Sequence, residues 1–291
     1  MKRKEFIRSL ALLSITAPNM TISELNKISG SFDSTKPMPI LFVGHGSPMN
    51  AIEENEFVKG WRQMGQSVPK PTAVLCISAH WETKGTFVTA MEKPATIHDF
   101  GGFPQALYEV QYPAAGSPAI AQKTKETVHS ASIELDQKWG LDHGCWSVVR
   151  HLYPKADVPV LQMSLDYNKP AQFHYDLGRE LNSLREKGVL IVGSGNIVHN
   201  LSIIDWRNPD SGYDWAEIAN AKIKKLVLEG DYKSLINYHK LGKEMELSVP
   251  SPEHYLPLLY ILALKKEKEQ IAIFNDKTVM GSISMSSFKI E

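Results

Sequence analysis

The sequence has little of what marks several classes of protein. It holds only two cysteines, Cys76 and Cys145, in 291 residues, which is too few for a disulfide framework, and they form no C-x-x-C pair. No apolar run approaches the ~20 residues that a membrane helix needs. Neither sign of charge is in excess, because 32 lysines and arginines balance 32 aspartates and glutamates, whereas proteins that neutralise phosphates are usually basic. We therefore expect neither a membrane protein nor a nucleic-acid binder.

What is present is typical of a globular enzyme or ligand-binding domain, with 43% hydrophobic and 22% charged residues. From Pro39 onward the chain has no linker, repeat or low-complexity tract. We therefore expect one continuous domain over residues 38–290. We expect a monomer or a small homo-oligomer.

Residues 1–37 are expected to be a leader that is either disordered or a weak export signal. The first seven residues resemble a twin-arginine signal with one arginine replaced by lysine. Arg8 interrupts the short apolar stretch, and no A-x-A cleavage site follows. We expect a cytoplasmic protein, and a periplasmic one only if this leader is used.

Short apolar runs alternate with helical patterns along the rest of the chain. Runs rich in β-branched residues that end at turn residues predict strands, and they cover residues 40–43, 73–78, 158–165, 189–192, 271–274 and 282–288. Helices are expected from Pro118, after Pro170, behind Asp214 as a cap, and over residues 258–264. This alternation predicts an α/β fold whose central, mostly parallel or mixed sheet has helices on both faces.

Three of the ten histidines closely follow expected strands. His45 follows the first strand, His80 the second, and His199 the strand at residues 189–192 with its Gly-Ser-Gly extension. In open α/β sheets, ligands bind at the carboxyl ends of the strands. We therefore expect His45 and His80 at the ends of neighbouring strands, with all three imidazoles able to converge.

A fourth histidine, His254, lies at the N-terminal mouth of the apolar helix, which begins at Pro252 or Pro257. Neutral imidazole is a good ligand for Zn, Fe, Cu and Ni. The four histidines together predict a metal site.

The remaining histidines divide by their surroundings. Three have polar neighbours in expected helices and are predicted to be solvated: His129, His174 and His239. His151 is expected to be structural. His98 and His143 lie in loops rich in glycine and aromatic residues, where binding residues are common, although each could equally be bonded to backbone.

At these residues the sequence resembles a known family. The motifs G-H-G-S-P-M-N, S-A-H-W, T-I-H-D-F-G-G-F-P, L-D-H-G-C-W, G-S-G-N-I-V-H-N-L and P-E-H-Y-L-P-L-L-Y resemble those of the 4,5-DOPA extradiol dioxygenase family. That family belongs to the class III extradiol ring-cleaving dioxygenases, alongside protocatechuate 4,5-dioxygenase. The resemblance runs from about Met38 to about Phe288, so it covers nearly everything except the leader.

Carried over by motif, the resemblance implies metal ligation by His45, His80 and His254, with His199 pointing into the same site. Class III enzymes commonly use two histidines and a glutamate, the facial triad of non-haem Fe(II), so Glu253 stays an alternative to His254. Four histidines would also suit tetrahedral Zn(II). We expect one divalent ion, with Zn(II) in the isolated protein and Fe(II) for turnover.

The implied reaction is extradiol cleavage of a DOPA-like catechol by O₂, giving a muconic semialdehyde. A neutral histidine can act as both base and acid at physiological pH. We assign this catalytic role to His199, and we expect His143 to steady the substrate or O₂. Four loop aromatics either wall the pocket or belong to the core: Trp81, Phe100, Phe103 and Trp146.

Two other functions are compatible with the same residues. One is a Zn-dependent hydrolase in which the metal activates water and His199 is the base, and the other is a metal-binding protein without catalytic activity. The expected partners are a small aromatic catechol and O₂.

Overall fold

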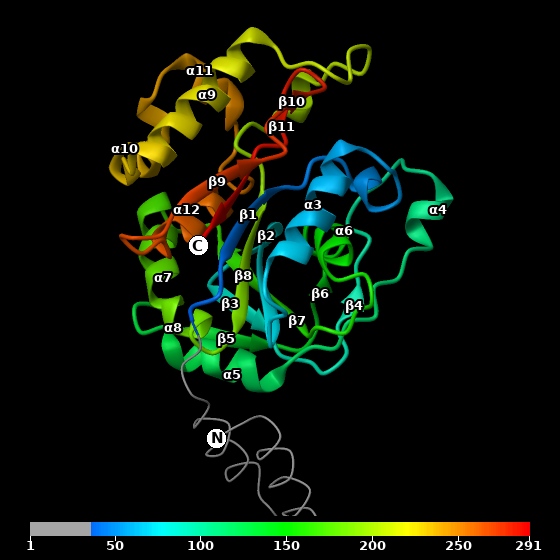
Figure 1. Ribbon diagram of the computed structural model, residues 1–291, viewed down its shortest axis with the longest axis vertical. Coiled ribbons are helices and arrows are strands. Elements are labelled where there is room, and N and C mark those ends of the chain that lie inside the picture. Colours follow the sequence, from blue (N-terminus) through cyan, green and yellow to red (C-terminus); the bar gives the residue numbers. More distant parts are fainter. Residues whose placement is uncertain (1–35) are drawn as a thin grey trace, which may run out of the picture. The chain divides into compact units, whose positions relative to one another are not determined.

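The computed structural model describes residues 36–291 (Figure 1). The expected leader, apart from its last two residues, therefore lies outside the described residues. Within the described part of the chain, no helix has the length and apolar character needed to cross a membrane.

A mixed sheet of eight strands forms the centre of the fold, in the order β5-β3-β7-β2-β8-β1-β12-β9. The strands are β1 (Ile40–Gly44), β2 (Ala73–Thr83), β3 (Thr86–Thr89), β5 (Ile133–Asp136), β7 (Val160–Asp166), β8 (Val189–Gly195), β9 (Ile271–Phe274) and β12 (Ser287–Ile290). The four central strands β7, β2, β8 and β1 are parallel. Beyond β1, β12 is antiparallel to β1, and β9 is antiparallel to β12. The predicted mixed α/β sheet is confirmed.

Helices and short strand pairs surround this sheet. The short pairs are β4 (Ala95–Thr96) with β6 (Gly140–Leu141), and β10 (Thr278–Val279) with β11 (Ile283–Ser284). The longer helices are α3 (Glu56–Ser67), α5 (Pro118–Thr127), α6 (His143–Leu152), α7 (Ala171–Glu180), α9 (Asp214–Glu229) and α12 (Leu256–Ala263). The shorter ones are η1 (Pro48–Ala51), α4 (Gln105–Tyr108), α8 (Asn182–Arg185), η2 (Leu201–Ile203), α10 (Tyr232–Ile236), η3 (Tyr238–Lys240) and α11 (Lys243–Ser248).

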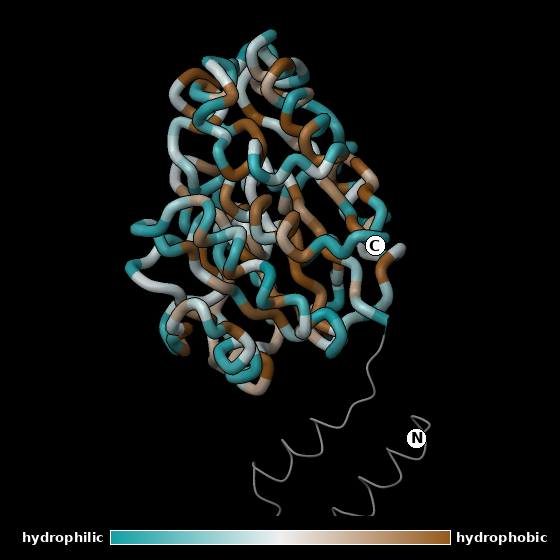
Figure 2. The backbone as a smooth tube through the Cα atoms, turned by 90° about the vertical axis from the view of Figure 1, so that its left-hand side faces the viewer, coloured by the Kyte–Doolittle hydropathy of each residue, from teal (hydrophilic) through white to brown (hydrophobic). Residues whose placement is uncertain are grey.

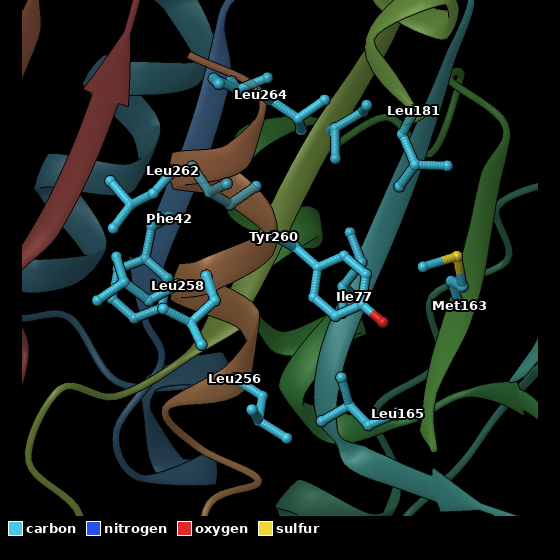
Figure 3. Close-up of a cluster of buried hydrophobic side chains, with 14 of the residues drawn as sticks. Phe42, Ile77, Met163, Leu165, Leu181, Leu256, Leu258, Tyr260, Leu262 and Leu264 are labelled. Carbon is cyan, nitrogen blue, oxygen red and sulfur yellow. The ribbon is translucent and has the colours of Figure 1, made fainter. Parts of the chain in front are cut away.

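Each face of the sheet carries its own hydrophobic core, because successive side chains of a strand point to opposite faces. Leu41 and Cys76 pack with residues of α3 and α6 on one face, whereas Phe42 and Ile77 pack with α7 and α12 on the other. Figure 3 shows Tyr260 of α12 reaching over the strands of this second core. In Figure 2 many of the hydrophobic stretches, in brown, lie in the interior of the folded part of the chain. Helices therefore cover both faces, as predicted.

Some sequence-based expectations were wrong in detail. β1 and β2 are not neighbours, since β8 pairs with both of them. β2 continues to Thr83, so His80 lies inside this strand, where its pairing with β7 shifts register between Ile77 and Glu82. The strand expected over residues 282–288 is broken into β11 and β12. Asp214 is the first residue of α9 rather than its cap.

The prediction of a solvated His174 was also wrong. Its side chain on α7 is fully buried because α7 packs against α12, where His174 Nδ1 lies 3.1 Å from the hydroxyl of Tyr260. The predictions for His129 and His239, whose side chains are exposed, were correct.

Burial lowers the pKa of His174 from 6.5 to about 4. Between these pH values the unfolded chain binds a proton at this residue that the folded chain does not bind, so the free energy of unfolding falls as the pH falls. This contribution amounts to about 3 kcal/mol. Between pH 7 and pH 4 we expect the free energy of unfolding of His174→Gln to fall by about 3 kcal/mol less than that of the wild type. Urea unfolding across this pH range measures the difference.

Tyr260→Phe is the matched control, because it removes the partner hydroxyl but keeps the titrating imidazole. It should retain the pH dependence of the wild type. An equally steep loss of stability in His174→Gln would contradict the assignment of this effect to His174.

Candidate metal centre

The four histidines predicted to form a metal site come from separate elements at one end of the central strands. His45 directly follows β1, His80 lies in the irregular part of β2, and His199 follows β8 by a short loop. His254 lies two residues before α12. An irregular register re-aims side chains in a strand, which explains how His80 reaches the site from within β2.

Three of these imidazoles converge. His45, His80 and His254 each offer one ring nitrogen, and these nitrogens lie within 4.8 Å of one another. The Nε2 atoms of His45 and His80 are 3.1 Å apart. Two nitrogens bound at about 2.0–2.1 Å to one ion would lie roughly 3 Å apart, so the spacing suits zinc or iron.

An unpaired buried atom supports a metal at this point. Nε2 of His254 is buried and has no hydrogen-bond partner in the described part of the chain, whereas buried polar atoms are nearly always bonded. The Nδ1 atom of the same ring lies 3.0 Å from the carboxylate of Glu253, to which it donates. Nε2 therefore carries a free lone pair, which is what a divalent cation needs.

Ser194 of β8 fixes the proton of His45 on Nδ1, as Glu253 does for His254. The Ser194 hydroxyl donates its hydrogen to the Gly144 carbonyl at 2.6 Å, so its oxygen accepts from Nδ1 of His45 at 3.0 Å. This leaves Nε2 of His45 unprotonated and directed to the centre. Such bonds on the far nitrogen orient the histidine ligands of metals.

Burial keeps these imidazoles neutral. It lowers the pKa of His45 and of His254 well below the ordinary value, and it lowers the pKa of His80 to about 3. A protonated ring in this cluster would lose its hydration, and any second protonated ring would repel it. The neutral form, which binds metals, therefore dominates at physiological pH.

His199 occupies a different position. Its ring stacks on His254, with ring centroids 3.4 Å apart and planes inclined by 9°. Its nitrogens belong to a second candidate group with Glu253 and His254, and not to the group formed with His45 and His80. Burial lowers the pKa of His199 to about 4. The structure therefore brings His199 beside the three converging imidazoles rather than among them.

His143 is held at the same centre by Asp99, a residue that the sequence analysis did not single out. One oxygen of Asp99 accepts from the His143 backbone N–H at 2.8 Å, and the other accepts from Nδ1 at 2.9 Å. The second oxygen also lies 3.6 Å from Nδ1 of His80. Burial would raise the pKa of Asp99, but the hydrogen bonds from His143 outweigh it and lower this pKa. The only sequence signal was the position of Asp99 next to His98.

His98 itself lies outside the cluster. Its Nε2 bonds to the Val110 carbonyl at 3.0 Å, so the backbone-bonded alternative holds. Trp81 is buried and stacks on Trp139, and Trp146 is fully buried in the core.

The other two aromatics of the predicted pocket wall differ from these tryptophans. Phe100 is half-buried, with its ring 5.6 Å from that of His143 in an edge-to-face arrangement. Phe103 packs on Phe100, at 5.4 Å between ring centroids. They are the aromatics placed to meet a substrate at the centre.

Glycines at the end of β8 let the loop of His254 approach. A Cβ on Gly195 would lie 2.2 Å from the His254 carbonyl oxygen, and one on Gly193 would lie 2.6 Å from the Pro257 carbonyl oxygen. The carbonyl of His254 accepts from the backbone N–H of Asn196 at 2.8 Å. The position of the third imidazole therefore depends on these two glycines.

Known proteins are similar to this chain over most of its length. Residues 37–283 match the family described as the catalytic LigB subunit of aromatic ring-opening dioxygenase. The chain is 48% identical to the 4,5-DOPA dioxygenase extradiol of Escherichia coli K12, over 88% of this chain and 96% of that protein. It is 34% identical to the 4,5-DOPA dioxygenase extradiol of Beta vulgaris, over 89% and 98% of the two chains.

A solved structure shares the fold. The crystal structure of an uncharacterized protein from Escherichia coli K12 matches with a TM-score of 0.77 at 42% identity. The match covers 87% of this chain and 100% of that chain.

We expect His254 rather than Glu253 to be the third metal ligand, because Glu253 bonds the far nitrogen of His254. His254→Ala should lose stoichiometric metal. Glu253→Ala should keep the ion while its affinity falls about 10–100-fold, as is usual when the partner of a ligand is removed. Metal content and affinity of the purified variants, with exposed His239→Ala as control, test this. Metal retained in His254→Ala and lost from Glu253→Ala would reverse the assignment.

Proposed function

We propose that this chain, which belongs to the family of the catalytic LigB subunit of aromatic ring-opening dioxygenases, opens a DOPA-like catechol with O₂ at an ion bound by His45, His80 and His254. It is an extradiol aromatic ring-opening dioxygenase, and enzymes of this family are metal-dependent. The observation that carries the proposal is the convergence of three neutral imidazoles on one point, with Nε2 of His254 buried and unpaired.

The choice of substrate follows from the relatives and from the donor set. The two similar proteins are named for 4,5-DOPA, a catechol whose adjacent hydroxyls can chelate one ion. Fe(II) held by the three imidazoles would supply electron transfer to O₂, which redox-silent Zn(II) would not supply. We therefore propose Fe(II) for turnover, while Zn(II) suits the same nitrogens in the isolated protein.

His199 is the proposed acid–base residue. Its neutral ring can take the proton of the second catechol hydroxyl and return it as the ring opens. With a pKa of about 4 it is a weak base in the free protein. A negative charge developing on the catechol oxygen would raise this pKa, because a nearby opposite charge favours the protonated imidazole.

His143 is proposed to hold the substrate. Because its Nδ1 donates to Asp99, its Nε2 is left as an acceptor for a catechol hydroxyl. Phe100, edge-on to the His143 ring, is suited to contact the face of an aromatic substrate. Asp99 would act through His143 by fixing the orientation of its ring.

The test of this function is oxygen uptake. Metal-free protein is reloaded with either Fe(II) or Zn(II) and given L-DOPA, and O₂ consumption is followed together with product. We expect the Fe(II) form to consume one O₂ for each ring opened, and the Zn(II) form to consume none. An Fe(II) form that binds the catechol without consuming O₂ would refute the dioxygenase proposal for this catechol and favour the hydrolase or the non-catalytic alternative.

We expect His199→Ala to keep most of its metal and its affinity for the catechol but to lose ring-cleavage rate by on the order of 10²–10⁴-fold, as is typical when a general acid–base is removed. Metal content, catechol affinity and O₂ uptake of the Fe(II)-loaded variant check this, with His239→Ala as control. Near-normal turnover would exclude the acid–base role, and a protein that no longer binds metal would make His199 a required ligand.

A further inference from the structure

A polar cavity lies away from the histidine cluster. Its volume is about 260 Å³, and its lining includes Arg62 of α3 and Arg150 and His151 of α6. Gln111 and Lys155 complete its polar lining together with backbone and Tyr112. Arg150 lies seven residues along α6 from His143, which is roughly 10 Å at 1.5 Å per residue. The cavity is therefore separate from the candidate metal centre.

The lining of this cavity carries positive charge without matching negative charge. Arg62, Arg150 and Lys155 are cationic, and the lining includes no aspartate or glutamate. Arg62 is neutralised by Glu54, which accepts from both of its terminal nitrogens. Across residues 36–291, neither Arg150 nor Lys155 has a carboxylate partner in an ion pair. Two cations of this cavity thus form no ion pair within the described residues, and the carboxylate near Lys155 is that of Asp157, which is already bound to Lys70.

Arg150 is the more buried of these two cations. Its guanidinium is half-buried, and a single bond from Nη1 to the Ala51 carbonyl, at 2.7 Å, uses one of its five N–H groups. Burial lowers the pKa of Arg150, and the charge of Arg62 lowers it further. No nitrogen of Arg150 is among the buried atoms that lack a partner, so its other N–H groups are accessible to a ligand. An anion in the cavity would supply the missing partner.

The neutral groups of the cavity are also compatible with a bound anion. The Tyr112 hydroxyl is turned inward and donates to the Tyr153 carbonyl at 2.9 Å, so it presents no donor to the cavity. His151 Nε2 bonds to the Asn50 carbonyl at 2.9 Å. Gln111 is exposed and forms no hydrogen bond within the part of the chain that the structure describes, so its amide is available to a ligand.

We propose that this cavity binds a small oxyanion, a carboxylate or a phosphate group, between the guanidinium of Arg150 and the ammonium of Lys155. A guanidinium offers two parallel N–H groups that match two oxygens of such an anion, and an ammonium adds a point charge. The volume of the cavity exceeds that of a single inorganic ion, so the natural ligand is a small organic molecule that carries this group.

The experiment measures binding, because contacts lead from the cavity toward the metal centre and could disturb activity. His151 bonds the carbonyl of Asn50, whose side chain donates to the His45 carbonyl at 3.0 Å. Inorganic phosphate and acetate are therefore titrated separately into the metal-loaded protein by calorimetry, at constant ionic strength set with sodium chloride. If only phosphate binds, the site is specific for a phosphate group. If both anions bind, the site also accepts a carboxylate.

Three variants make the test decisive. Arg150→Gln should weaken anion binding by about 10-fold or more, the loss expected for a charge-assisted hydrogen bond. Lys155→Gln changes an exposed side chain, so it keeps the fold and should weaken binding several-fold. Lys268→Gln removes an equally exposed positive charge far along the sequence and should leave binding unchanged. No saturable binding of either anion at millimolar concentration, or unchanged binding in Lys155→Gln and Arg150→Gln, would overturn the proposal.

Discussion

The end of β8 has no room for any side chain at Gly193 or Gly195, and the metal centre depends on this. Gly193 and Gly195 lie against the backbone that carries His254 and Pro257, so any Cβ there would collide with a carbonyl oxygen. Between them, Ser194 bonds His45 and Gly144. Since β8 pairs with β1 on one side and β2 on the other, this short segment sets how closely the histidines of three elements approach.

Burial has two effects at this centre. It raises the cost of protonating His45, His80 and His254, so the rings stay in the form that binds a cation. It also leaves Nε2 of His254 without a hydrogen-bond partner among the residues that the structure describes. A site of this kind is costly for the metal-free fold, since its polar atoms have lost hydration. A bound ion would remove that cost, because metal binding contributes to the stability of the state that binds it.

The polar partners of the histidines differ with their proposed roles. His45 and His254 have their Nδ1 atoms engaged by Ser194 and Glu253, which leaves Nε2 for an ion. His143 has Nδ1 engaged by Asp99, which leaves Nε2 for a substrate. Within residues 36–291, the His199 ring has no such partner and stacks on the ring of His254 instead. Without a fixed hydrogen bond, its ring nitrogens remain available to take up and release a proton.

The sequence by itself determined the α/β class, the main strands and the four histidines, because hydrophobic periodicity and local motifs are properties of neighbouring residues. It also supported the family, since several motifs occur in one order along the chain. Only the tertiary structure decided that β8 separates β1 from β2, that His80 lies within a strand, and that His174 is buried. The partnerships of Asp99 with His143 and of Ser194 with His45 join residues 44 and 149 positions apart. Such contacts leave no periodic trace in the sequence, because they arise only when the sheet brings distant segments together.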